Sequence, residues 1–253
     1  MQIIAVVITP TVLAVVAAVL LGRRRAVIGG EFDADSVSFV GGVLSALFTV
    51  VLAFYVVFAW QVGSDISSSS DTEANALIDA YAQAGATAEP TRGTAQGLLR
   101  DYAGEVADRE WDALRLQGEA DPKLTHLIGQ LRALFTALPA GDPGSQLARE
   151  QSLRDVRQID ESHRARVDSA TGNKVFNRVL LGGTVVGAAL MVAFPLLAGL
   201  SRRPVNVMVI GVLAASLGAV VFLALQLARP LDGPFGVDPD SFREALSRMT
   251  PAT

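Results

Sequence analysis

The chain has 253 residues, a formal net charge of −4 and no cysteine. The nearly balanced charge argues against a nucleic-acid partner. The lack of cysteine excludes disulfides, thiolate nucleophiles, lipoprotein acylation and cysteine metal sites. Arginine outnumbers lysine and alanine is abundant, which is typical of a GC-rich bacterial genome.

Long apolar runs without a charged residue dominate the sequence. They are Ile3–Leu21, Phe39–Trp60, Val179–Leu200 and Val205–Ala228. Each has about the twenty residues that a helix needs to cross about 30 Å of hydrocarbon. The sequence therefore predicts a polytopic membrane protein with four transmembrane helices. The expected parts are a first hairpin (1–60), an extramembrane domain (61–177), a second hairpin (178–228) and a C-terminal tail (229–253).

Short basic loops predict the orientation. Arg23–Arg25 follow the first span and Arg202–Arg203 precede the fourth, and basic residues in short loops stay in the cytoplasm. We therefore expect a multi-pass protein of the cell membrane with the middle domain and both termini outside the cytoplasm. Lys174, Arg178 and Arg229 lie close to spans three and four and weaken this signal. Only Met1 and Gln2 precede the first span and its arginines follow it, so we interpret it as an uncleaved helix rather than a signal peptide.

The middle domain carries helix-start signals and no period-two pattern, so the predicted class is all-α with about four helices in this domain. A capping box at Ser70–Glu73 predicts one helix start. Pro90 predicts a second, and Asp121-Pro122 and Asp142-Pro143 predict two more, because Asp caps a helix and Pro suits its first turn. Asp238-Pro239 predicts a short helix in the tail, and we expect Phe235 and Phe242 to dock the tail on the middle domain.

Candidate chemistry is sparse. The chain lacks a P-loop, a zinc-spaced histidine pair and a Gly-x-Ser-x-Gly elbow, so we do not expect an enzyme. The uncharged spans also argue against an ion-coupled transporter. We expect His163 to be a satisfied core histidine and His126 to be solvated. Four acids on one predicted helix are expected to form a solvated face: Glu105, Asp108, Glu110 and Asp112.

Span two has a narrow face of small and polar residues beside a bulky face. The small face is Ser38, Gly42, Ser45, Thr49 and Ala53, and the bulky face is Leu44, Phe48, Val51, Tyr55 and Phe58. Small faces let membrane helices approach closely, so helix packing explains this pattern. A pore lining with Phe48 or Tyr55 as an apolar constriction is the alternative.

Small-x-x-x-small spacings recur in the last two spans. They include Gly183 and Gly187 in span three, and Gly211 and Gly218 in span four. We expect these glycines to make helix-packing contacts, either inside the four-helix bundle or between protomers.

Several stretches carry a likeness to a known family. They are the arginines after span one, Glu73-Ala74-Asn75-Ala76-Leu77 after span two, the helix with Arg154, Arg164 and Arg166 before span three, and Leu231-Asp232-Gly233-Pro234-Phe235 with Phe242 after span four. With these residues the chain resembles a widespread bacterial family described as bestrophin-like. It differs from the family pattern just before span three, where it has Asn173, Lys174 and Phe176, and its tail is shorter.

The resemblance implies a homo-oligomeric channel for inorganic ions. Bestrophins are pentameric anion channels whose second span lines the pore, which would here place Ser45, Phe48, Thr49, Leu52 and Tyr55 on the axis. The resemblance also implies calcium, with Asp232, Asp238 and Asp240 as its ligands; no other cofactor is expected. Bestrophins keep the large middle region in the cytoplasm, opposite to the orientation expected from the basic loops.

A function from a different class stays open. The chain would then be a non-conducting membrane sensor, scaffold or accessory subunit that binds a partner through its helical domain. The lipid bilayer and further copies of the chain are the expected partners in either case.

Overall fold

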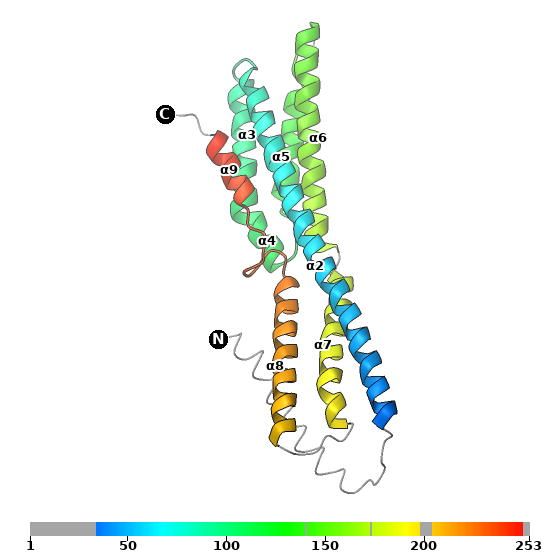
Figure 1. The fold of residues 1–253 in the computed structure, drawn as a ribbon. Helices are drawn as coiled ribbons and strands as arrows, with labels where there is room; N and C mark the ends of the chain where they lie inside the picture. The colour runs from blue at the N-terminus through cyan, green and yellow to red at the C-terminus, as the bar shows by residue number, and fades with distance from the viewer. Residues whose placement is uncertain (1–33, 140, 173, 198–203, 250–253) are drawn as a thin grey trace. The chain divides into compact units, whose positions relative to one another are not determined.

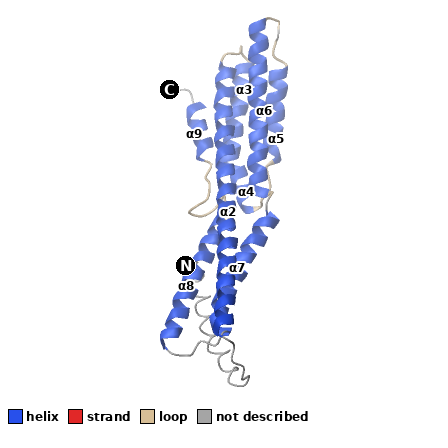
Figure 2. Cartoon of the chain, turned by 45° about the vertical axis from the view of Figure 1, so that its right-hand side comes forward, coloured by secondary structure: helices blue, strands red, loops and turns tan. Residues whose placement is uncertain are grey.

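The computed structural model describes residues 34–139, 141–172, 174–197 and 204–249. All regular elements within these residues are helices, as Figures 1 and 2 show. The chain forms two compact units. The first unit contains Met1–Trp60 and Lys174–Arg229, and the second contains Gln61–Asn173 and Pro230–Thr253. The predicted all-α class is confirmed.

The helices follow one another along the chain. They are α2 (Ala34–Gly85), α3 (Thr91–Glu105), the π-helical turn η2 (Val106–Glu110), α4 (Trp111–Leu116), α5 (Pro122–Thr136), α6 (Pro143–Thr171), α7 (Lys174–Leu197), α8 (Pro204–Leu227) and α9 (Asp240–Met249). Among the described residues, three helical stretches are long and apolar enough to cross a membrane: Ser38–Gly85, Pro143–Pro195 and Val205–Leu227. The expected first span and both basic loops lie outside the described residues.

The first unit is built from the beginning of α2 together with α7 and α8. Two apolar clusters hold these helices together. One has Phe48, Ala188 and Leu217 at its centre, and the other has Tyr55, Ala59 and Ala224. Both clusters combine residues from the second expected span with residues from the last two, so the first part of α2 shares one unit with α7 and α8.

The second unit is a helical bundle with one apolar core. Helices α3, α5 and α6 pack in sequence, and α5 contributes the regular stripe of Leu124, Leu127, Ile128, Leu131 and Phe135. Asp121 caps α5 by accepting a hydrogen bond from the Lys123 amide. Asp142 caps α6 in a reciprocal box with Ser145. The helix starts that were predicted at Pro90, Asp121-Pro122 and Asp142-Pro143 are confirmed.

The predicted helix start at Ser70 is wrong. Helix α2 runs without interruption from Ala34 to Gly85, past the end of the apolar run. The Ser70 hydroxyl donates to the carbonyl of Ile66, one turn earlier, at 2.7 Å. A serine in mid-helix can satisfy its hydroxyl in this way, so the local capping pattern did not break the helix.

Helix α9 packs against α3 and η2 in the second unit. The Trp111 indole donates to the carbonyl of Val237 at 3.1 Å, just before α9, and Arg100 Nε donates to the carbonyl of Met249 at its end. Phe242 is fully buried, whereas Phe235 keeps 61% of its surface exposed. Phe242, and not Phe235, therefore anchors the tail helix.

Candidate functional site

The part of α2 in the first unit turns one face towards α7 and α8. Phe48 and Tyr55 are buried on this face, and Leu52 is partly buried between them. The Tyr55 hydroxyl donates to the carbonyl of Ala224 in α8 at 2.6 Å. This hydrogen bond satisfies the one polar group on an otherwise apolar face and fixes the rotation of α2 against α8.

Glycines in α7 make room for α2. A Cβ atom at Gly187 would lie 2.7 Å from the Phe48 ring, and one at Gly183 would lie 3.6 Å from Val51. Phe48 therefore occupies the space that the missing side chain of Gly187 leaves. In α8, Gly218 is buried, whereas a Cβ at Gly211 would meet no atom within 4 Å.

The remaining surface of α2 in this unit is exposed and has two kinds of residue. Ser38, Gly42, Thr49 and Ala53 form an exposed small face, with Ser45 half-buried at its edge. The Thr49 hydroxyl donates to the Ser45 carbonyl within the helix at 2.9 Å. The next face around the helix is apolar and exposed, and we call it the exposed apolar face. Its residues are Phe39, Val43, Leu47, Val50, Phe54 and Val57.

The residues predicted to line a pore thus fall into two groups. Ser45 and Thr49 lie on or beside the exposed small face, whereas Phe48, Leu52 and Tyr55 point towards α7 and α8. The expected pore would lie between subunits, which a single chain does not test, so its lining stays a prediction. The sequence showed both faces of α2 but did not show which face the neighbouring helices would cover.

The second unit contains a buried cluster of charged residues. Arg166 of α6, Glu73 of α2 and Glu110 of η2 have no exposed surface. Arg166 Nε donates to Glu73 Oε2 at 2.9 Å, and its Nη2 donates to Glu110 Oε2 at 2.7 Å. One guanidinium therefore joins two carboxylates from different helices. Such charge-assisted bonds are strong, but each charge has lost its hydration.

Tyr102 and His163 complete this cluster. The Tyr102 hydroxyl donates to Glu73 Oε1 at 2.6 Å. The His163 ring lies between the two carboxylates, with Nδ1 3.8 Å from Glu73 Oε1 and Nε2 3.7 Å from Glu110 Oε1. Burial, reinforced by the negative charge of Glu73, raises the pKa of Tyr102 well above its usual value of 10.0. Tyr102 thus remains a neutral hydrogen-bond donor to Glu73.

Aromatic rings cover the guanidinium of Arg166. Its central carbon lies 5.5 Å from the centre of the Trp111 ring and 5.2 Å from the centre of the Phe242 ring. Both distances suit a cation–π contact. Because Phe242 belongs to α9, the tail helix closes over the charged cluster.

Sequence reasoning found only part of this cluster. The expectation of a solvated acidic face was wrong for Glu110, which is fully buried, and for Glu105, which is 8% exposed and pairs with Lys123. Asp108 and Asp112 are exposed as expected. His163 is buried as expected, and its neighbours are charged. The sequence signal that could have revealed the site is the position of Arg166 beside the apolar line of α6, three residues after His163.

The predicted calcium ligands lie at the surface. Asp232, Asp238 and Asp240 are all exposed, and Asp240 pairs with Arg243 at 2.9 Å. Within the described residues, no group of three or more His, Asp or Glu side chains is arranged to hold a metal ion. Calcium binding stays a prediction that this geometry does not support.

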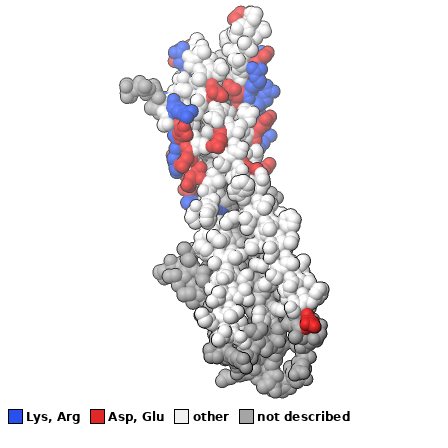
Figure 3. All heavy atoms as spheres, in the orientation of Figure 1, with Lys and Arg blue, Asp and Glu red and all other residues white. Residues whose placement is uncertain are grey.

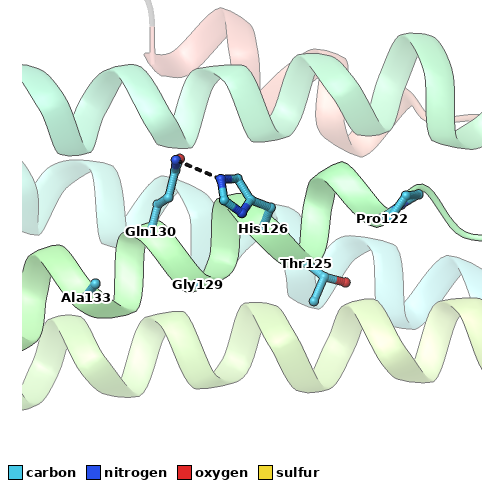
Figure 4. Close-up of a pocket in the computed structure, with 6 residues that line it drawn as sticks. All are labelled: Pro122, Thr125, His126, Gly129, Gln130 and Ala133. Atoms are coloured by element: carbon cyan, nitrogen blue, oxygen red, sulfur yellow. Dashed lines mark hydrogen bonds between the residues drawn. The ribbon is translucent and has the colours of Figure 1, made fainter.

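A shallow groove on the second unit is a weaker candidate site. Figure 4 shows its lining on one helix, α5, with His126 directed towards Gln130 at 3.1 Å. Its volume is about 640 Å³, and its lining is Pro122, Thr125, His126, Gly129, Gln130 and Ala133. The groove is open and its lining contains no Lys, Arg, Asp or Glu, so it does not point to a catalytic or ion-binding site.

The distribution of charge separates the two units. Figure 3 shows Lys, Arg, Asp and Glu side chains gathered over the second unit, and almost none on the visible surface of the first. The first unit therefore presents the apolar surface that a bilayer requires. The second presents a surface suited to water.

The chain was compared with models of protein families. The model of the bestrophin-like domain matches residues 8–242, which cover most of both units. Comparisons with curated proteins and with solved structures each found no match.

Proposed function

The chain belongs to the bestrophin-like family, and on this premise we propose that it forms a homo-oligomeric membrane channel whose axis is lined by α2. The family likeness to ion channels supports the general activity. The surface of α2 supports the assignment of the lining helix.

The observation that carries this proposal is the division of α2 into three faces. Phe48 and Tyr55 bind the helix to α7 and α8 within the subunit. The exposed apolar face suits lipid, which solvates large aliphatic and aromatic side chains well. The small face, with Thr49 and Ala53 exposed, is poorly suited to lipid contact and well suited to a narrow aqueous path or to close approach by another helix.

The proposed lining explains how an uncharged span can conduct. Ser45 and Thr49 supply hydroxyl groups, and the small residues around them leave room for water. Apolar necks conduct when they are wetted, so charged rings within the bilayer are not required. Phe48 and Tyr55 act from behind the lining, because they set the rotation of α2.

The first test is the symmetry of the assembly in lipid nanodiscs, by electron microscopy with mass analysis. We expect a ring of subunits with the small face of α2 towards the axis. A monomer, or an assembly with the small face buried in a closed interface, would contradict the proposal and favour the non-conducting scaffold.

Single-cysteine variants give the sharper test, because the natural chain has no cysteine. Thr49→Cys places a thiol on the small face, and Phe54→Cys places one on the exposed apolar face. A charged methanethiosulfonate reagent should reduce the bilayer current of Thr49→Cys and leave that of Phe54→Cys unchanged. Equal responses from the two variants, or no current from the reconstituted wild type, would sink the assignment.

The orientation belongs to the same proposal. We propose that the second unit faces away from the cytoplasm, as the short basic loops predict. An exposed position such as Glu119 can be replaced by cysteine and labelled in intact cells with a membrane-impermeant maleimide. Labelling without permeabilisation is expected, and labelling only after permeabilisation would reverse the orientation.

A further inference from the structure

From the geometry of the buried cluster in the second unit, we infer that it is a proton-binding site, with His163 as the acceptor, and that proton uptake weakens the docking of α9. This inference is independent of the proposed conduction and concerns the second unit alone.

The charge balance of the cluster provides the first argument. One guanidinium, Arg166, faces two carboxylates, Glu73 and Glu110, and all three side chains are fully buried. With both carboxylates ionised and His163 neutral, one negative charge remains uncompensated away from water. A buried unpaired charge is costly, and a bound proton removes the imbalance.

The position of His163 provides the second argument. Each ring nitrogen lies within 3.8 Å of a different carboxylate. Glu110 Oε1, which faces Nε2, is buried and has no hydrogen-bond partner among the described residues. The imidazolium form would therefore have an acceptor for each of its two N–H groups after a shift of less than about 1 Å, since N–H···O bonds are 2.7–3.2 Å long.

The hydrogen bonds in the structure correspond to the unprotonated state. Nδ1 of His163 lies 3.2 Å from Nη2 of Arg166. A guanidinium only donates hydrogen bonds, so a hydrogen bond between these two nitrogens requires an unprotonated Nδ1. Protonation of Nδ1 would replace this hydrogen bond with a contact between two cations, and the new N–H would turn to Glu73.

The groups around His163 leave few other sites for the proton. Glu73 faces it from α2, Glu110 from η2 and Arg166 from its own helix α6. Tyr102 faces it from α3, with its ring centre 6.3 Å away, and its raised pKa keeps it protonated. Arg166 does not lose its proton in proteins. Histidine is the side chain of this set whose ordinary titration falls at about pH 5–8.

The coupling to α9 passes through Arg166. The guanidinium that His163 contacts is the same group that lies against the Phe242 ring. Repulsion from a protonated His163 displaces this guanidinium and weakens its contact with α9. The site therefore links the proton concentration around the second unit to the position of the C-terminal helix.

The test measures the distance between α9 and α3 as the pH changes. Spin labels are attached to Ser247→Cys and Asp101→Cys, which are both at exposed positions of the full chain. The labelled protein is placed in nanodiscs and mixed with an excess of unlabelled protein, so that distances between subunits do not contribute. At about pH 8 we expect one short distance, and at about pH 5 we expect part of the population at longer distances. A distribution that is unchanged over this range overturns the coupling.

Three variants, one of them a matched control, test the role of His163. The chain has two histidines, so His126→Gln is the matched control and should keep the pH response, whereas His163→Gln should abolish it. Glu110→Gln removes the charge imbalance and should reduce the response. A response that persists in His163→Gln overturns the inference. If these variants do not fold, NMR of ¹³C-labelled histidine in the wild type decides: two titrating rings are expected, and a single one refutes the site.

Discussion

Glu73 and Arg166 form a fully buried two-point ion pair although 93 positions separate them in the chain. Nε and Nη2 of the arginine reach the two oxygens of the carboxylate at 2.9 and 3.2 Å. Glu73 lies on the helix that continues from the second apolar run, and Arg166 lies on the helix that precedes the third. The pair therefore ties together the two chain segments that lead into and out of the second unit.

Removal of Arg166 should strongly destabilise the second unit. Arg166→Met leaves two buried carboxylates without their cation, which typically costs about 3–5 kcal/mol. Arg164→Met is the matched control, because Arg164 is 70% exposed in its pair with Asp160 and should contribute about 0–1 kcal/mol. Denaturant unfolding followed by circular dichroism measures both free energies. Equal stability of the two variants would contradict the ionised cluster described above.

Substitution of Gly187 should disturb the packing of α7 on α2. In Gly187→Ala the new Cβ would lie 2.7 Å from the Phe48 ring, so the ring or the helix must move, at a cost of about 1–3 kcal/mol. Gly211→Ala has open space and should be neutral or should stabilise the helix by up to about 1 kcal/mol. Thermal unfolding in detergent compares the two variants, and a neutral Gly187→Ala would show that this close contact does not exist.

Tyr55→Phe should have a modest effect on the first unit. The substitution removes the hydrogen bond to the Ala224 carbonyl and keeps the ring, for an expected loss of about 0.5–1.5 kcal/mol. That carbonyl also accepts from the Ala228 amide at 3.0 Å, so it is not left without a donor. Phe54→Leu on the exposed face is the control. A loss much above this range would indicate a wider rearrangement of α2.

The ion pair of Glu105 with Lys123 should make stability depend on pH in the acid range. A hydrogen bond from Lys123 Nζ, 2.5 Å away, lowers the pKa of Glu105 below its ordinary value of 4.5. Because the folded state lowers this pKa, the stabilisation is complete above about pH 4.5 and is lost as the pH falls through the lower folded-state value.

Lys123→Met therefore should reduce stability near neutral pH by about 1 kcal/mol or less, because Lys123 is about half exposed. The difference from wild type should vanish in acid, where Glu105 is protonated in both proteins. Arg115→Met, which breaks an exposed pair with Asp112, serves as the control. The test is the free energy of unfolding of wild type and Lys123→Met, measured across the acid range. A difference between the two proteins that persists at the lowest pH would contradict the ion pair of Glu105 with Lys123.

Local patterns predicted the features that depend on neighbouring residues. The apolar runs predicted α2, α7 and α8, and the Asp-Pro pairs predicted the starts of α5 and α6, because these signals act within a few residues. The start predicted at Ser70 failed, because a serine inside a helix can satisfy its hydroxyl on the carbonyl one turn earlier, as Ser70 does on Ile66. The sequence also predicted a helix for α9 around Phe242.

Only the tertiary structure decided which faces and charges meet. The two faces of α2 were visible in the sequence, but the packing of α7 and α8 determined that Phe48 and Tyr55 are covered while Thr49 is exposed. Glu110 looked like one acid among several on a wet helix until the fold placed it beside Arg166, 56 positions away. Periodicity and caps are local properties of a chain, whereas burial and ion pairing depend on contacts between residues far apart in sequence, which a single sequence does not specify.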